Sequence, residues 1–133
     1  MHSQLLYILQ AGGEVRFLDV LASEGVQAQK TFDKQYGSGK AVFIQCDVSK
    51  KNELRDVFYE AKSQMGGLNV VCNNAAIITI DIEEEKSRFE EMLSTNFGAV
   101  INGCFLGTEL MGKGQGGNGG VIINTSSISD VTE

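Results

Sequence analysis

The chain has 133 residues, 42% of them hydrophobic and 21% charged, so one globular domain with a real apolar core is expected. The formal net charge of −6 disfavours nucleic acid and anionic membranes as partners, because both bind basic faces. No apolar run reaches the roughly 18 residues of a membrane span and no signal peptide is recognisable, so a cytoplasmic protein is expected.

Helical and strand patterns alternate in the first half of the chain. The predicted helices cover residues 3–10, 22–36 and 51–65. The predicted strands cover residues 14–20, 41–45 and 68–72. The helix over 51–65 has the clearest pattern, because its apolar residues recur at three- and four-residue steps.

The second half is predicted to contain a loop over 77–85, a long helix within 86–111 and a strand over 121–124. On the long helix, Phe89, Leu93 and Phe105 are expected to share one broad apolar face with Asn96. Strands separated by helices imply right-handed crossovers and a parallel sheet. The sequence therefore predicts a single α/β domain over 1–133, a Rossmann-like doubly wound parallel sheet with helices on both faces.

Two segments resemble ligand sites but have simpler interpretations. The glycine-rich run 112–120 leaves a helix and enters a strand, whereas a phosphate loop leaves a strand and opens a helix, so a flexible linker is predicted. The acidic run 81–85 is interpreted as a solvated loop entering a helix, where carboxylates favour the positive end of the helix dipole.

The cysteines and the single histidine limit the chemistry. Cys46, Cys72 and Cys104 are far apart in sequence and odd in number, which favours reduced thiols. There is no Cys-x-x-Cys pair and the only histidine is His2, so no metal site is predicted. Because His2 is the only histidine, catalytic mechanisms of the Ser-His-Asp and Cys-His types are also excluded.

Two carboxylates end predicted strands, where parallel α/β proteins bind ligands. Asp19 could accept hydrogen bonds from the adenosine ribose of NAD, or could be an ordinary solvated residue. Asp47 could accept a hydrogen bond from an adenine amino group, with Val48 packed against the adenine ring. Alternatively, Asp47 could help to start the helix near Lys51. Both interpretations stay open for each residue.

Amides and hydroxyls follow the later strands. Asn74 could leave room for a ribose or form a plain Asx turn. Asn96 is expected to be a buried amide that bonds a neighbouring backbone, with or without a water. Ser126 and Ser127 could hydrogen-bond a carbonyl substrate or simply end their strand.

Taken in order, these motifs resemble the classical short-chain dehydrogenase/reductase family. The segments that carry the resemblance are 43–48, 54–56, 73–75, 116–124 and 126–127. It implies NAD as cofactor, a secondary alcohol or ketone as substrate, and a homodimer through the long helix near Asn96–Met111. The cofactor-binding residues that it implies are Asp19, Val20, Cys46, Asp47, Val48 and Asn74. Ser127 would align the substrate oxygen, and Asn96 would hold a proton-relay water.

The chain departs from the family pattern at three places. No glycine-rich loop precedes Asp19, and no Tyr-x-x-x-Lys follows Ser127. The one match to that string, Tyr36 to Lys40, is predicted to be a turn, and Ala76 stands where the family usually has glycine. An incomplete domain is therefore expected, lacking the first strand and the C-terminal half, in which the fourth strand loses the neighbour that links it to the second.

The departures predict that the 133-residue chain alone does not turn over substrate. The alternative is a non-catalytic truncated module that binds nucleotide or pairs with a partner. A methyltransferase is a third interpretation, because that class also has acids after its second and third strands. The Asn-Asn-Ala segment 73–75 and the serines 126–127 argue against it.

Overall fold

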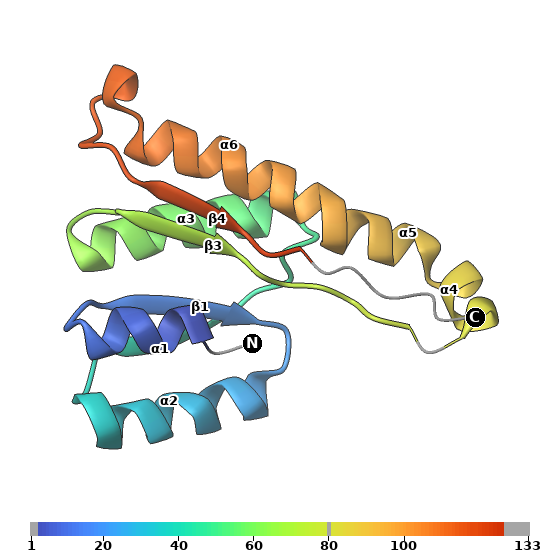
Figure 1. The fold of residues 1–133 in the computed structure, drawn as a ribbon, viewed down its shortest axis with the longest axis horizontal. Helices are drawn as coiled ribbons and strands as arrows, with labels where there is room; N and C mark the ends of the chain where they lie inside the picture. The colour runs from blue at the N-terminus through green and yellow to red at the C-terminus, as the bar shows by residue number, and fades with distance from the viewer. Residues whose placement is uncertain (1–2, 80, 127–133) are drawn as a thin grey trace.

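The computed structural model describes residues 3–79 and 81–126, in which helices and parallel strands alternate (Figure 1). The first elements are α1 (Ser3–Gln10), β1 (Val15–Asp19), α2 (Ala22–Tyr36), β2 (Ala41–Gln45), α3 (Lys51–Met65) and β3 (Val70–Asn73). They are followed by α4 (Ile82–Ser87), α5 (Phe89–Met92), the π-helix η1 (Leu93–Gly98), α6 (Ala99–Met111), the short 3-10 helix η2 (Lys113–Gln115) and β4 (Val121–Asn124). The predicted α/β fold class is confirmed.

The strands form two separate parallel pairs in the described part of the chain. β1 pairs with β2 from Val15↔Ala41 to Asp19↔Gln45. β3 pairs with β4 from Val70↔Val121 to Asn73↔Asn124. This is the arrangement expected of a doubly wound sheet whose central strand is absent from this stretch, since β1 and β3 would be its two neighbours.

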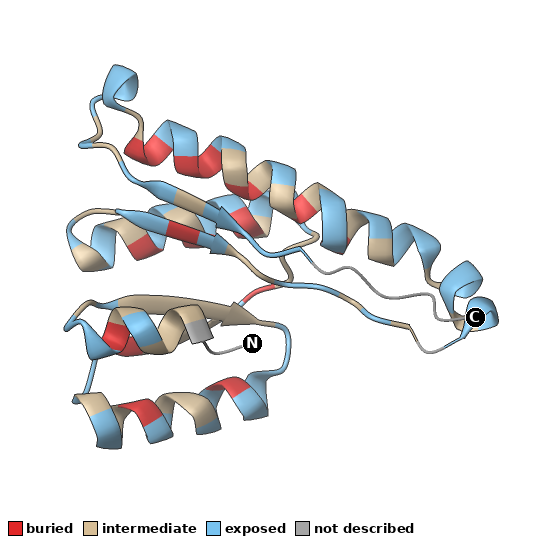
Figure 2. Ribbon diagram, in the orientation of Figure 1, coloured by how far each residue is buried: buried red, intermediate tan, exposed pale blue. Residues whose placement is uncertain are grey.

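Two apolar clusters cover the two faces of the β1–β2 pair (Figure 2). On one face, Leu9 of α1 and Phe32 of α2 are buried with Ala41, and Phe17 packs beside them. On the other face, the cluster consists of Cys46, Leu54, Val57 and Leu106, with Leu18, Ile44, Val48 and Phe58 against it. Helices therefore pack on both faces of this sheet, as the sequence predicts.

Contacts between α3 and α6 join the two halves of the molecule. Leu106 is the only α6 side chain in the cluster with Leu54 and Val57 of α3. The Nζ of Lys62 donates to the main-chain oxygen of Leu110 at 3.0 Å. The hydroxyl of Tyr59 also hydrogen-bonds the Glu109 carboxylate. These side chains hold the β3–β4 half against the β1–β2 half.

The prediction for the long helix was wrong about its buried face. Phe89, Leu93 and Phe105 are exposed, whereas Thr95 and Leu106 are buried. The cause is η1, a π-helical turn in the middle of the segment, because it changes the angular spacing that a 3.6-residue pattern assumes. The large apolar side chains at positions 89, 93 and 105 are therefore turned away from the core.

Two connections also differ from the prediction. Residues 82–85, expected as loop, begin α4, because Oδ1 of Asp81 accepts the N–H groups of Glu83 (3.0 Å) and Glu84 (2.9 Å). The glycine-rich run 112–120 folds back on the end of α6 rather than forming a loose linker. The Gly119 N–H donates to the Met111 carbonyl at 2.8 Å, which ties the end of the run to the helix.

Candidate functional site

A pocket of about 330 Å³ lies at the carboxyl ends of β1 and β2. Its lining residues are Val20, Gln45, Asp47, Lys50 and Glu53. The amide of Gln45 donates to the Val20 carbonyl at 3.1 Å and so ties the two strand ends together. Strand ends of this kind are where open parallel sheets bind ligands.

Asp19 is the last residue of β1 and is half-buried. Its Oδ1 accepts the N–H of Leu21 at 3.0 Å, and its main-chain oxygen accepts the N–H of Cys46 at 3.0 Å. No hydrogen bond to its Oδ2 occurs among residues 3–79 and 81–126. One carboxylate oxygen therefore orients the side chain, and the other can accept from a ligand hydroxyl.

Asp47 helps to fix the start of α3, which is one of the two interpretations that the sequence left open, and it also lines the pocket. Its Oδ1 accepts the N–H (3.1 Å) and the hydroxyl (2.6 Å) of Ser49, which fixes the turn before α3. Its Oδ2 lies 3.5 Å from the Lys50 ammonium, and the residue lines the pocket. The Ser49 hydroxyl, with the nearby charge of Lys50, lowers the pKa of Asp47, so the carboxylate is ionised at neutral pH.

The side chains of Cys46 and Val48 point into the core cluster and are not among those that line the pocket. Cys46 is 1% exposed, and its main-chain N–H is the group that contacts Asp19. Burial raises the pKa of the Cys46 thiol to about 11, with Glu53 and Asp47 adding to the shift. Cys46 therefore supports the strand ends through its backbone and is not a nucleophile at neutral pH.

We expect Cys46 to react with Ellman's reagent at pH 8 only after unfolding, because its thiol is buried and the thiolate is scarce below the raised pKa. Cys72 is exposed and should react in the native state. The measurement compares thiol release with and without urea. In Cys46→Ala the urea-dependent thiol should disappear, and in Cys72→Ser it should persist; the reverse pattern would contradict the placement of these residues.

A second polar group lies under α6 at the ends of β3 and β4. The amide of Asn73 donates to Oδ1 of Asn124 at 2.8 Å and reaches the carbonyl of Val100 at 3.5 Å. The sulfur of Cys104 lies 3.7 Å from the Asn73 nitrogen. Asn73 therefore fixes the strand ends, while Asn74, half-buried, begins the segment that leaves the sheet.

Asn96 pairs with a backbone, as predicted, but it is exposed and not buried. Its Oδ1 accepts the N–H of Ile77 at 2.7 Å, and its Nδ2 donates to the Ile77 carbonyl at 2.9 Å. The amide is satisfied by this two-way contact on the outside of η1, which is why it does not need the core. The contact anchors the segment after Asn74 to the long helix, at a π-helical turn of the kind often found at functional sites.

Of the two serines expected to hydrogen-bond the substrate, only one lies among the described residues. Ser127 lies outside the described residues. Ser126 is exposed after β4. The neighbouring Thr125 is fixed from two sides, because its N–H donates to the Asn73 carbonyl at 3.0 Å and its hydroxyl accepts from Gln4 of α1 at 3.2 Å.

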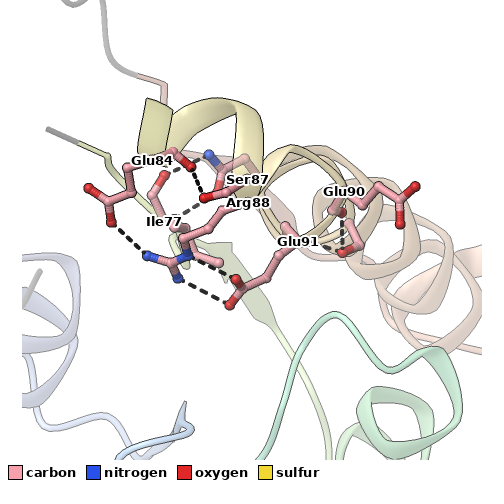
Figure 3. Close-up of polar contacts among 8 residues, drawn as sticks. Ile77, Glu84, Ser87, Arg88, Glu90 and Glu91 are labelled. Atoms are coloured by element: carbon pink, nitrogen blue, oxygen red, sulfur yellow. Dashed lines mark hydrogen bonds and ion pairs between the residues drawn. The ribbon is translucent and has the colours of Figure 1, made fainter. Parts of the chain in front are cut away.

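Acidic residues of α4 and α5 form ion pairs with Arg88 of the same chain (Figure 3). Nη1 of Arg88 lies 3.2 Å from Oε1 of Glu84, and its Nε lies 2.9 Å from Oε2 of Glu91. These two carboxylates raise the pKa of the Arg88 guanidinium. Together with the capping by Asp81, this supports the interpretation as a solvated helix start. No group of three or more potential metal ligands comes together within residues 3–79 and 81–126.

Tyr36 and Lys40 do not form a catalytic pair. The Tyr36 hydroxyl is buried and has no hydrogen-bond partner in the described part of the chain. The Lys40 ammonium lies 3.2 Å from the Glu14 carboxylate, on the surface. The turn between them follows α2, as the sequence predicts.

Sequence reasoning missed three of the lining residues: Gln45, Lys50 and Glu53. The sequence did contain a sign of two of them. Lys50 and Glu53 follow Asp47 by three and six residues, at the start of a helix, and the first turn of such a helix lies close to the strand ends. The Asp47 N–H donates to Oε1 of Glu53 at 3.0 Å, which holds this carboxylate at the pocket.

Among the described residues, no helix has both the length and the apolar character to cross a membrane.

Parallel strands, alternating helices and carboxylates at two neighbouring strand ends define an α/β domain of the dinucleotide-binding type. The short chain dehydrogenase family model matches residues 5–132, and the chain belongs to this family of oxidoreductases. The expectation drawn from the ordered motifs is thereby confirmed.

Similar proteins agree with this assignment. The chain is 36% identical over 122 residues to human 15-hydroxyprostaglandin dehydrogenase [NAD(+)], covering 92% of this chain and 44% of the human protein. It is 34% identical over 96 residues to tropinone reductase-like 2 of Erythroxylum coca, covering 68% of this chain and 34% of that one. The chain therefore spans less than half the length of these relatives.

Two solved structures share the fold. A putative short-chain dehydrogenase from Novosphingobium aromaticivorans matches 92% of this chain and 46% of its own, with a TM-score of 0.80 and 22% identity. A mutant short-chain dehydrogenase/reductase of Serratia marcescens matches 91% and 48%, with a TM-score of 0.75 and 23% identity. Both similarities cover more than nine tenths of this chain and concern the fold.

Proposed function

We propose that this chain is the nucleotide-binding part of an NAD-dependent dehydrogenase that acts on a secondary alcohol or ketone, similar to 15-hydroxyprostaglandin dehydrogenase. The observation that carries the proposal is the position of Asp19 at the end of β1, with Oδ1 bonded to Leu21 and Oδ2 open to a ligand. A carboxylate at this point suits the two ribose hydroxyls of adenosine. The neighbouring pocket, with Val20 and Asp47 in its lining, would take the adenine ring.

The charges around the pocket favour NAD over NADP. Asp47 and Glu53 line it, and Asp19 is at the adjoining strand end. Among the described residues, Lys50 is the one cation in the lining. Because the Lys50 ammonium already faces Asp47, a ribose 2′-phosphate would meet excess negative charge. The site chemistry therefore fits an unphosphorylated adenosine ribose.

The remaining candidate residues would serve the reacting end. Bound NAD would supply the hydride acceptor. Asn74 would contact the nicotinamide-side ribose, Ser127 would orient the substrate oxygen, and Asn96 would hold a relay water beside its contact with Ile77. Proton transfer from an alcohol needs a base near its hydroxyl, and Tyr36 with Lys40 does not provide one. We therefore expect no turnover by residues 1–133 alone.

The test is NAD binding by the chain, followed through the adenosine protons in ligand-observed NMR. Asp19→Asn should weaken NAD binding by at least about tenfold, because a hydrogen bond to a charged acceptor contributes roughly 1.5–3 kcal/mol. The same variant should narrow the preference for NAD over NADP. Asp56→Asn, the same change at an exposed position of α3, is the control and should bind as the parent chain does. Equal binding by the parent chain and Asp19→Asn would refute the proposal, and so would a preference for S-adenosylmethionine over NAD.

We also propose a homodimer through the long helix, which would make the chain a partner module if it is not catalytic. Along α5, η1 and α6, apolar side chains stand exposed at every fourth position: Phe89, Leu93, Phe97, Ile101 and Phe105. Residues four apart are neighbours on a helix surface, so these five form one stripe. A continuous exposed apolar stripe of this kind is typical of an association surface.

A second copy of the chain is the proposed occupant of this stripe, because a two-fold interface pairs the same patch on both subunits. Phe97→Glu should shift the sedimentation coefficient from dimer to monomer, since a carboxylate would be buried without a partner. Val26→Glu, an exposed apolar position on α2, should leave the dimer intact. A parent chain that sediments as a monomer at all concentrations would contradict the homodimer.

A further inference from the structure

Two asparagines of the chain are followed directly by glycine: Asn102 in α6, and Asn118 in the glycine-rich run 112–120 before β4. An Asn-Gly step is especially prone to deamidation, because glycine has no side chain to keep its nitrogen away from the asparagine amide. The two steps lie in different backbone environments, so the structure predicts different fates for them.

At Asn102 the helix prevents the reaction. The following residue, Gly103, lies inside α6, where each N–H donates to the carbonyl four residues earlier. Gly103 is also buried, and its Cα lies against the side chain of Asn73. The backbone therefore cannot rotate to bring the Gly103 nitrogen to the Asn102 side chain.

At Asn118 the backbone is held by hydrogen bonds of the connection alone. Asn118 is exposed, and residues 116–120 belong to no helix or strand. The Gly119 nitrogen, which would have to attack the asparagine amide, donates its proton to the Met111 carbonyl at 2.8 Å. The Gly117 N–H likewise donates to the Gly112 carbonyl at 3.0 Å. The Gly119 nitrogen becomes free only when the run detaches from the end of α6.

We propose that Asn118 is a site of deamidation and that opening of the 112–120 run sets its rate. In the open run, the Gly119 nitrogen loses its proton to hydroxide and bonds to Cγ of Asn118. The Cγ–Nδ2 bond breaks, and the leaving amide takes a proton from water and departs as ammonia. Water then opens the resulting succinimide ring at either carbonyl. One product is aspartate, and the other is isoaspartate, in which the main chain passes through Cβ and Cγ.

The isoaspartate product does not fit the closed connection, because it adds one carbon atom to the main chain at position 118. The backbone on either side has no space to take up this extra length. A Cβ at Gly117 would overlap the Met111 main chain, and one at Gly120 would overlap the Met111 sulfur. The longer backbone must therefore displace the run from α6 or shift Val121 at the start of β4.

The test follows the two Asn-Gly peptides by mass spectrometry after the folded chain has been kept at pH 8 and 37 °C. Conversion to aspartate and isoaspartate is expected at Asn118, with none at Asn102 over the same time. In urea both backbones are free, so the two asparagines should react at comparable rates. Asn118 should then react at least about fivefold faster than in the folded chain, because the closed run no longer has to open.

A matched pair of variants tests the opening step. Gly116 has a φ of +81°, so alanine strains the closed run, and Gly116→Ala should speed conversion at Asn118 about fivefold or more. Gly114→Ala, where a new Cβ meets open space, is the control and should not speed it. Equal rates in the two variants would overturn the proposal. So would conversion of Asn102 alongside Asn118 in the folded chain, or no conversion at Asn118.

A stability measurement separates the longer backbone from the added charge. The aged chain, enriched in isoaspartate, should unfold at a lower urea concentration than the fresh chain. Asn118→Asp adds the same charge on an ordinary backbone and should unfold where the parent chain does. An equal loss in both samples would contradict the role of the longer main chain. The proposal concerns the connection before β4 and does not depend on nucleotide binding.

Discussion

Leu106→Ala is expected to lower the free energy of unfolding by roughly 2–5 kcal/mol, the usual cost of truncating a buried leucine. Leu106 is 7% exposed and is the only α6 residue in the cluster with Cys46, Leu54 and Val57. Because no hydrogen-bonded strand bridges β1 and β3 in the described residues, this cluster is the main apolar contact between the two halves. Whole small domains have only about 5–15 kcal/mol of stability, so this loss would remove a large part of it and lower the midpoint of unfolding in urea.

Urea unfolding followed by circular dichroism measures this effect. The control is Leu21→Ala, the same change at a residue that is 53% exposed before α2. It should change the free energy of unfolding by less than about 0.5 kcal/mol. If both variants lost stability equally, the cluster around Leu106 could not be what holds α6 against α3.

The sequence was sufficient for elements whose ends carry glycine and whose patterns are regular. α2 and α3 have the predicted bounds, because Gly37 and Gly66 stop them and their apolar residues follow a helical period. It was insufficient at η1, where the π-helical turn breaks the period that the prediction assumed. It also missed the start of α4, which depends on a side-chain cap at Asp81 and not on an apolar pattern.

In the candidate site, the positions of residues along the strands were predictable from the sequence, but the orientations of their side chains were not. Asp19 and Asp47 are found at neighbouring strand ends, as predicted, because parallel strands bring their carboxyl ends to one edge of the sheet. The orientation of each side chain was not predictable: Val48 turns into the core, and Asn96 turns outward to Ile77. Those orientations depend on packing between elements far apart in sequence, which periodicity does not encode.

Gly103→Ala is expected to disturb the polar group at the ends of β3 and β4. A Cβ at position 103 would overlap the side-chain oxygen of Asn73, which lies against α6. Asn73 would have to move away from Asn124, losing the 2.8 Å hydrogen bond from its amide to the Asn124 side chain. Overpacking and the lost bond should together cost about 1–3 kcal/mol, even after the gain in helix propensity from alanine.

Gly98→Ala is the matched control in the same long helix. Its nearest neighbour would be the Leu93 carbonyl at 3.8 Å, an ordinary contact, so alanine should be neutral or stabilise by up to about 1 kcal/mol. Combining Gly103→Ala with Asn73→Ala should restore part of the loss, because the shorter side chain leaves room for the new methyl group. Urea unfolding gives the free energies, and the Asn73 side-chain amide signal in NMR reports its displacement. Strictly additive losses in the double variant would mean that Gly103 does not act through Asn73, since a shared steric contact requires the second change to relieve the first.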